Sequence, residues 1–290
     1  MLTKTREFNM AFYITKASGK QEAFDRVKFR RSLKRAGATT EAIKNLIQDI
    51  EERTDLRTTK QIYRYALQKL KIADRSVATR YNLKHAIATL GPTGFSFEKY
   101  MAKLFEQMGF DVTLNQIMKG ACIEHEIDFV AEKNSVALLV ECKFHTLHTL
   151  KSDLKIALYV HARLQDIEKF WKDTPFHGQE TREAWIITNT RFSAQAIRYA
   201  ECAGIKLLGW SYPAHKTLPD MINEIGLHPI TALTTLKRKY QKELIQNGIV
   251  LCRELIDHPD ALRSLGISMS QAELAIQEAK SVCEFPVNEY

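Results

Sequence analysis

The sequence contains no run of 18 apolar residues, which argues against a membrane-spanning helix. Its opening stretch, MLTKTREFNMAFYITK, is too polar to include the apolar core of a secretory signal peptide. The five cysteines are far apart and form no CxxC pair, so the sequence indicates neither a structural zinc site nor a disulfide framework. We therefore expect a cytoplasmic protein with reduced thiols and no membrane partner.

Basic residues are concentrated in the first third of the chain. The net charge is +8, yet residues 1–90 carry 20 Lys and Arg against 9 Asp and Glu, and the remainder is slightly acidic. A cationic surface attracts phosphate groups, so this distribution predicts a nucleotide or nucleic-acid ligand for the first third. The alternative is a basic surface that is only solvated.

Three segments follow one another, and together they predict a multidomain α+β protein. Residues 11–90 begin with a short strand and a glycine turn, and continue as a small helical bundle. Gly91-Pro92 interrupts the helical pattern and is typical of a linker. Residues 92–213 alternate strands and helices, and residues 217–285 are helical again.

The central segment is predicted to form a mixed sheet with helices on its faces. It opens with an amphipathic helix over 95–108. Apolar runs then predict a strand over 110–116 and a hairpin of strands 127–132 and 136–143. The later elements are a long helix over 151–172, a strand over 184–188, a helix over 193–203 and a strand over 205–210.

Charged residues gather at one end of the predicted hairpin. Asp128 begins one strand and Glu141 lies near the end of the next, so antiparallel pairing brings the two carboxylates together. Oxygen ligands of this kind suit Mg²⁺, and the backbone carbonyl of Cys142 is a candidate third ligand. Lys143 shares a strand face with Glu141, where an ammonium can stabilise phosphate charge. Glu98 on the preceding helix is a candidate outer carboxylate.

These residues resemble the motif of the PD-(D/E)xK nucleases, and in particular the Mrr-like type IV restriction endonucleases. Asp128 matches the motif aspartate, Glu141-Cys142-Lys143 matches the (D/E)xK element, and Glu98 matches the acidic position on the first helix. The stretch TNTRFSAQAIRYAECAGIKLLGW is similar to the distal strand–helix–strand of that branch. The resemblance covers about 92–212. One departure is Glu124-His125-Glu126, which stands where that branch commonly has a Gly-Gly pair.

The resemblance implies a phosphodiester hydrolase that uses Mg²⁺ or Mn²⁺ and cleaves double-stranded DNA as a dimer or larger homo-oligomer. Two other functions remain open for the same fold. One is a nucleotide-responsive DNA-binding regulator whose nuclease site is silent. The other is a structure-specific nuclease that resolves branched DNA.

The N-terminal segment is similar to the ATP-cone, a regulatory nucleotide-binding domain. The matching positions are Lys16, Gly19, Phe24, Asp25 and Lys28. Ala17 and Ser18 replace an Arg-Asp pair of that family, and Lys20 or Arg31 can supply the missing charge. The resemblance implies ATP or a related adenine nucleotide as effector. The alternative is a basic helical bundle that binds DNA directly.

The C-terminal segment is weakly similar to helix-hairpin-helix modules, with Leu265-Gly266-Ile267-Ser268 as the hairpin turn. Such turns present backbone N–H groups to a phosphate. A helical packing or dimerisation module is equally consistent with the sequence. His145 and His148 follow the predicted lysine strand, and they either line the site or belong to a solvated loop.

Overall fold

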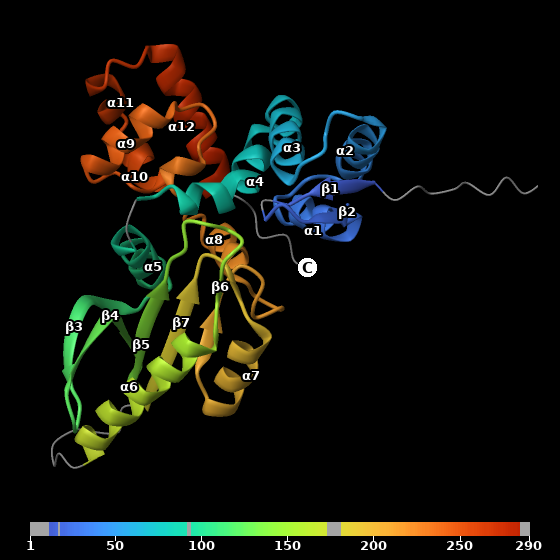
Figure 1. Ribbon diagram of the computed structural model, residues 1–290. Helices are drawn as coiled ribbons and strands as arrows, with labels where there is room; N and C mark the ends of the chain where they lie inside the picture. The colour runs from blue at the N-terminus through green and yellow to red at the C-terminus, as the bar shows by residue number, and fades with distance from the viewer. Residues whose placement is uncertain (1–11, 17, 92–93, 173–180, 285–290) are drawn as a thin grey trace, which may run out of the picture. The chain divides into compact units, whose positions relative to one another are not determined.

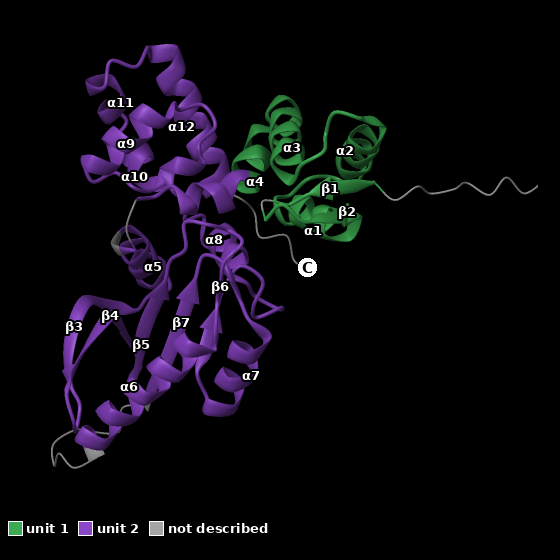
Figure 2. Ribbon diagram, in the orientation of Figure 1, with its two compact units in different colours: residues 1–81 green, residues 82–290 purple. Residues whose placement is uncertain are grey.

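The structure is a computed structural model, and it describes residues 12–16, 18–91, 94–172 and 181–284 (Figure 1). The chain divides into two compact units, residues 1–81 and residues 82–290 (Figure 2). Among the described residues, none of the helices combines the length and the apolar character needed to cross a membrane.

The first unit combines a two-stranded hairpin with helices. Its elements are β1 (Tyr13–Thr15), β2 (Gln21–Ala23), α1 (Arg26–Arg35), α2 (Thr40–Glu52), α3 (Thr59–Ala73) and the first half of α4 (Arg75–Ala88). Asp25 begins α1 by accepting a hydrogen bond from the N–H of Lys28 at 2.8 Å. Thr58 and Gln61 form a capping box at the start of α3. Side-chain caps at Asp25 and Thr58 therefore define where α1 and α3 begin.

Apolar side chains spaced for helical faces form the core of this unit. Phe29 and Leu33 of α1 pack with Ile47 and Ile50 of α2 and with Ile62 of α3. Each such side chain, when fully buried, contributes about 1.5–3 kcal/mol to the free energy of unfolding.

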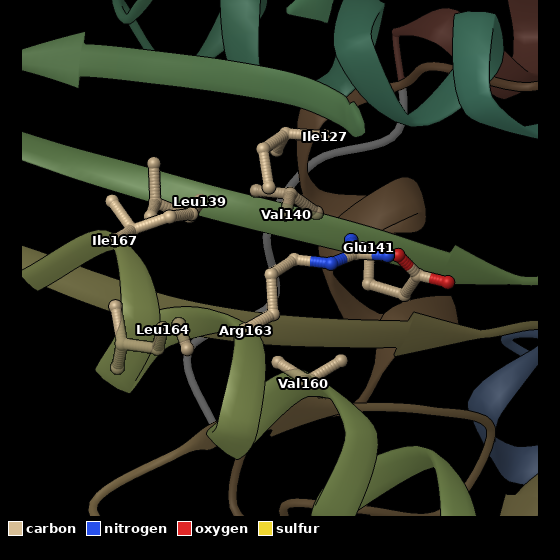
Figure 3. A pocket seen from close by; sticks show the side chains of 9 residues that line it. Ile127, Leu139, Val140, Glu141, Val160, Arg163, Leu164 and Ile167 are labelled. Atoms are coloured by element: carbon tan, nitrogen blue, oxygen red, sulfur yellow. Dashed lines mark hydrogen bonds and ion pairs between the residues drawn. The ribbon is translucent and has the colours of Figure 1, made fainter. Parts of the chain in front are cut away.

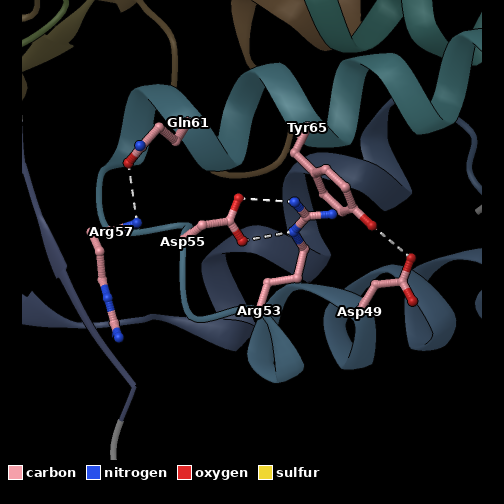
Figure 4. A network of polar contacts seen from close by, with 6 residues as sticks. All are labelled: Asp49, Arg53, Asp55, Arg57, Gln61 and Tyr65. Carbon is pink, nitrogen blue, oxygen red and sulfur yellow. Dashed lines mark hydrogen bonds and ion pairs between the residues drawn. The ribbon is translucent and has the colours of Figure 1, made fainter.

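A polar network links the end of α2 to α3 (Figure 4). The Tyr65 hydroxyl donates to Asp49 at 2.9 Å, and the Arg53 guanidinium lies 4.7 Å from the centroid of the Tyr65 ring. Arg53 also holds Asp55 through two hydrogen bonds of 3.0 and 2.8 Å. These contacts hold the segment between α2 and α3 in place, although Arg53 and Asp55 stay exposed.

The second unit contains a five-stranded mixed sheet in the order β3-β4-β5-β7-β9. The β3/β4 and β4/β5 pairs are antiparallel, whereas β5/β7 and β7/β9 are parallel. The strands are β3 (Asp111–Lys119), β4 (Glu124–Lys133), β5 (Val136–Lys143), β7 (Thr181–Thr188) and β9 (Lys206–Leu208). Asn134 and Ser135 join β4 to β5 with positive φ angles of 50° and 61°, as a tight hairpin requires.

Helices cover both faces of this sheet. α5 (Phe95–Gln107) packs on one face, where Phe105 meets Phe129 and Val140. α6 (Leu154–Lys172) and α7 (Ala194–Ala203) pack on the other face, through residues such as Ile167 and Ala196. Because side chains alternate along β5, even-numbered residues face α5 and odd-numbered residues face α6. This alternation decides where Glu141 points.

The C-terminal helices belong to the same compact unit as the sheet. Leu218 and Ile222 of α8 share one hydrophobic core with Phe97 of α5, and the buried Tyr100 hydroxyl donates to the Leu227 carbonyl at 2.6 Å. The sequence predicted domains over 92–213 and 217–285, and α8 of the second range packs against α5 of the first. The remaining elements are α8 (Leu218–Ile225), η1 (Ile230–Ala232), α9 (Arg238–Gln246), α10 (Cys252–Asp257), α11 (Asp260–Ser264) and α12 (Met269–Cys283).

Several element boundaries differ from the sequence predictions, and two of the differences involve strand pairing. The long helix starts at Leu154 instead of 151, because Lys151–Ser152 forms β6 and pairs with β8 (Arg191–Phe192). The first strand of the sheet continues to Lys119, beyond the predicted end at 116. The β6–β8 pairing joins segments about 40 residues apart, whereas the end of β3 pairs with the start of β4 across a short turn.

Candidate active site

Asp128 lies where β4 separates from β5. The pairing of these strands ends at Phe129 and Val140, so the N–H of Cys142 is available to donate to the Asp128 carboxylate at 2.6 Å. Opposite Asp128 on β3, Asn115 adopts a positive φ of 51°, a conformation that Asn tolerates better than most residues. The break in the pairing of β4 with β5 therefore places the Asp128 carboxylate against the backbone of β5.

Glu141 points from β5 toward α6 and meets an arginine there. Arg163 Nη1 lies 2.7 Å from Glu141 Oε2, and both side chains are largely buried, at 9% and 16% exposure (Figure 3). The Arg163 guanidinium also donates to the Tyr159 hydroxyl and lies 4.4 Å from the centroid of that ring. Burial opposes the charge on Arg163, but Glu141 and Tyr159 raise its pKa nonetheless. Glu141 is thus held in one orientation by a buried cation.

Lys143 and Cys142 complete the end of β5. Lys143 is exposed and shares the α6-facing side of the strand with Glu141. The Cys142 thiol is buried in the core on the α5 side, and that burial raises its pKa well above the ordinary value. Because the N–H and carbonyl of one strand residue point to the same side, the Cys142 carbonyl is directed toward β4, as is its N–H.

Carboxylates crowd this end of the sheet. Burial and the neighbouring Glu141 raise the pKa of Asp128 to about 7, with Glu98 adding to the effect. Burial also raises the pKa of Glu98, and Glu141 and Glu126 raise it further. The structure therefore brings Glu98, Asp128 and Glu141 into one electrostatic cluster, and it adds Glu126.

These residues fit a hard divalent cation. Two carboxylates and a directed backbone carbonyl are oxygen ligands. Burial is the main cause of the raised pKa of Asp128, and the nearby charge of Glu141 adds to it; a cation would offset that charge. Across the described parts of the chain, no three side chains of His, Cys, Asp or Glu are grouped closely enough to hold a metal ion. A site here would therefore combine the side chains of Asp128 and Glu141 with backbone and water ligands.

A buried hydroxyl network supports the end of β5. The Thr188 hydroxyl donates to the Lys143 carbonyl at 2.8 Å and accepts from the Ser152 hydroxyl at 3.0 Å. Asn189 accepts from the N–H of His145 and donates to the carbonyl of His145, both at 2.8 Å. His145 is thus a partly buried member of this network, where burial and Lys143 lower its pKa.

His125, the central residue of the Glu124-His125-Glu126 stretch, has a structural role. His125 Nε2 lies 2.8 Å from Asp166 on α6, and Asp166 also accepts from the N–H of Cys122 at 2.9 Å. The His125 and Cys122 contacts lower the pKa of Asp166 to about 2. The turn between β3 and β4 is therefore tied to α6, while Glu126 contributes charge to the carboxylate cluster.

The predicted nucleotide-binding residues lie on the hairpin and the first helix of the first unit. Gly19 has a positive φ of 82°, and its N–H donates to the Lys16 carbonyl at 2.9 Å, so a tight turn joins β1 to β2. Lys16 and Lys20 both approach Glu22, at 3.6 and 3.7 Å. Phe24 packs edge-on against Phe12 in the core, whereas Lys28 and Arg31 are exposed on α1.

Sequence reasoning missed Arg163. The apolar stripe of the long helix includes Val160, Leu164 and Ile167, and Arg163 lies on that stripe beside them. An arginine at a core-facing position requires a buried hydrogen-bond acceptor. The place of Arg163 among apolar residues was therefore the signal in the sequence. Its partner Glu141 was identifiable only once β5 was paired and its faces were assigned.

Two families match parts of the chain. Residues 91–210 match the family described as Restriction endonuclease, and residues 228–283 match the family described as AF1548-like, C-terminal. The sequence had instead suggested a weak likeness to helix-hairpin-helix modules for the C-terminal segment. Neither match reaches residues 1–90, so the ATP-cone stays a prediction.

Other proteins are similar to about half to two thirds of the chain. An uncharacterized protein of Archaeoglobus fulgidus is 41% identical over 183 residues, which are 63% of this chain and 99% of that protein. A crystal structure of AF1548, a protein of unknown function, is 38% identical with a TM-score of 0.51, covering 66% of this chain and 98% of that one. The restriction endonuclease MspJI, in complex with a 27-mer oligonucleotide, is 15% identical with a TM-score of 0.26 over 49% of this chain and 29% of that one, too low to carry an argument.

Proposed function

This chain belongs to the AF1548-like family and carries a restriction endonuclease domain, and from that premise we propose that it is a Mg²⁺-dependent DNA endonuclease regulated by a nucleotide. The domain implies nuclease activity and DNA binding at the level of the family. The metal, the residue roles and the nucleotide are our proposal.

One observation carries the proposal. Asp128 is fixed by the N–H of Cys142 at 2.6 Å, beside Glu141 and at the edge where Lys143 emerges. A purely structural sheet end gains nothing from crowding carboxylates at a place where burial, together with the charge of Glu141, raises the pKa of Asp128 to about 7. A metal-dependent phosphodiesterase can use such a cluster to hold its cation and an adjacent ammonium to stabilise phosphate charge.

Each residue then has a role in hydrolysis of a phosphodiester bond. Asp128, Glu141 and the carbonyl of Cys142 would hold Mg²⁺ or Mn²⁺, which supplies a Lewis acid and lowers the pKa of a bound water. The Lys143 ammonium donates to a non-bridging phosphate oxygen and stabilises the charge that develops there. Glu98 orients water at the edge of the cluster through its carboxylate.

Arg163 positions Glu141 in this scheme. Its guanidinium bonds one Glu141 oxygen at 2.7 Å, which leaves the second oxygen of that carboxylate to face the cluster. It also lowers the pKa of Asp128, although less than burial and Glu141 raise it. The arginine therefore reduces repulsion among the carboxylates while the chain carries no cation.

The N-terminal unit is proposed to bind ATP or a related adenine nucleotide. The tight turn at Gly19 lets the backbone approach phosphates, and Lys16, Lys20, Lys28 and Arg31 supply positive charge near it in the chain. Phe24 is partly buried against the core of this unit and would form one wall of the nucleotide site. Nucleotide binding would change the oligomeric state or the access of DNA to the nuclease.

Plasmid cleavage tests the proposal. Wild-type protein should nick or linearise supercoiled plasmid with Mg²⁺ and should fail to do so in EDTA, and ATP should change the rate. DNA binding without cleavage in Mg²⁺ or Mn²⁺, with or without ATP, would instead favour a regulator with a silent nuclease fold. Preference for four-way junctions over linear duplex would favour a structure-specific nuclease. ATP titration followed by light scattering tests the regulatory unit, and no binding at millimolar ATP would refute it.

A further inference from the structure

Basic side chains from three separate elements of the second unit meet outside the carboxylate cluster. Lys84 and His85 lie on α4, His148 lies in the segment between β5 and β6, and Arg238 begins α9. Arg238 Nη2 donates to His85 Nε2 at 2.6 Å. Lys84 Nζ lies 5.3 Å from the centroid of the Trp210 ring. We name these four residues the α4–α9 basic cluster.

The cluster concentrates positive charge within a small volume. His148 is near enough to Lys84 and His85 that burial, followed by these two neighbours, lowers the pKa of His148 to about 4. Burial and Arg238 likewise lower the pKa of His85. The lowered pKa values favour the uncharged form of both histidines, so the charge of the cluster comes from Lys84 and Arg238.

The start of α9, within the cluster, indicates an anionic ligand. The first turn of α9 contains no acidic residue, its N-cap Lys237 makes no side-chain capping bond, and Arg238 and Lys239 follow. Cations at the positive end of a helix are unfavourable unless an anion is present. An anion bound at the start of α9 would offset the charge of Arg238 and Lys239 there.

Chain connectivity places the cluster close to the carboxylate site. His148 lies five positions after Lys143, and an extended chain spans at most about 3.6 Å per residue, so their Cα atoms are at most about 18 Å apart. Successive phosphates of one DNA strand are about 3.4 Å apart along the duplex axis. An anion at the cluster therefore lies within about five base pairs of a phosphate at Lys143.

We propose that the α4–α9 basic cluster binds the sugar-phosphate backbone of duplex DNA a few base pairs from the phosphate that Lys143 addresses. This inference deepens the proposed function and rests on it for the second phosphate. It assigns the cluster to positioning of the duplex, since contacts to phosphates carry no sequence information.

The test is the salt dependence of duplex binding by the full chain in EDTA, measured by fluorescence anisotropy from about 50 to 200 mM NaCl. The variant is Lys84→Gln with Arg238→Gln. Its matched control is Lys206→Gln with Lys280→Gln, which removes the same charge from exposed positions on β9 and α12. We expect the slope of log K against log salt to shrink by about 2 and the affinity at 100 mM salt to fall at least about tenfold, with the control near wild type.

Charge-conserving substitutions separate lost contacts from lost folding. Lys84→Arg with Arg238→Lys should retain the wild-type slope, because phosphate contacts require the charge more than the side-chain shape. Equal slopes for the glutamine variant and its control would overturn the inference. A glutamine variant that loses ATP binding while its duplex slope is unchanged would also overturn it.

The outcomes distinguish this inference from the proposed nuclease activity. A wild-type chain that binds duplex through Lys84 and Arg238 but does not cleave it would support the inference and remove the nuclease. A chain that cleaves duplex although the glutamine variant has the control slope would remove the inference and leave the nuclease standing.

Discussion

Replacing Asp128 with Asn should stabilise the protein in metal-free buffer near neutral pH. Burial and Glu141 raise the pKa of Asp128 from 3.8 to about 7, so the folded chain accommodates the neutral carboxyl better than the carboxylate. An Asn side chain is uncharged at every pH and still offers an oxygen to the N–H of Cys142. The substitution therefore removes the repulsion and retains the hydrogen bond.

The size of this gain in stability follows from the pKa shift of Asp128. Each pKa unit corresponds to about 1.36 kcal/mol, so the shift of Asp128 corresponds to about 4 kcal/mol as an upper value. The folded pKa is raised, so the stabilising contribution of the protonated carboxyl is complete below about pH 4. It is lost as pH rises from about 4 through about 7. The variant and wild type should thus be similar at pH 4 and differ most at pH 8.

Urea denaturation in EDTA across this pH range measures the difference. Glu132→Gln provides the control, because Glu132 is an exposed carboxylate on the same strand, and its substitution should change the free energy of unfolding by less than about 0.5 kcal/mol. Adding Mg²⁺ should raise the stability of wild type at pH 8 and leave that of Asp128→Asn unchanged. A variant that is less stable than wild type at pH 8 in EDTA would refute the reasoning.

Three further changes have defined outcomes. Arg163→Met leaves the largely buried Glu141 carboxylate without its cation, so urea denaturation should show a free energy of unfolding lower by about 3 kcal/mol. Adding Glu141→Gln should recover most of that loss. A loss that the second substitution does not reduce would argue against the ion pair. Glu278→Gln removes a buried carboxylate that accepts four hydrogen bonds from the segment before α9, and circular dichroism melting should report a loss of about 2 kcal/mol, whereas an unchanged melting temperature would contradict that role. Thr188→Val removes the hydroxyl that holds the Lys143 carbonyl, so DNA cleavage should slow about tenfold with little change in duplex affinity, and an equal loss of both would point to misfolding.

Local patterns were sufficient to predict the hairpin that carries the candidate site. The apolar runs on either side of Asn134 and Ser135 predict two strands and a turn, and antiparallel pairing then brings Asp128 near Glu141. The central mixed sheet with helices on its faces followed from the same alternation of strands and helices, and it is the architecture observed.

Long-range contacts were not predictable from these patterns. The contact of Arg163 with Glu141 depends on which face of the sheet α6 covers, and periodicity is silent on that point. The link from His125 to Asp166 likewise joins residues 41 positions apart. The shared core of α5 and α8 is a third case, because it joins helices that lie far apart in the chain.

The rate of Mg²⁺-dependent DNA cleavage by Lys143→Ala is the most direct test of the central claim. Single-turnover cleavage of supercoiled plasmid should slow by about 100- to 1,000-fold, because one group that stabilises the developing phosphate charge is lost. Lys206→Ala, an exposed lysine on β9, should cleave at the wild-type rate. Duplex affinity in EDTA should stay within a few fold for both variants. Cleavage by Lys143→Ala at the wild-type rate would contradict the account.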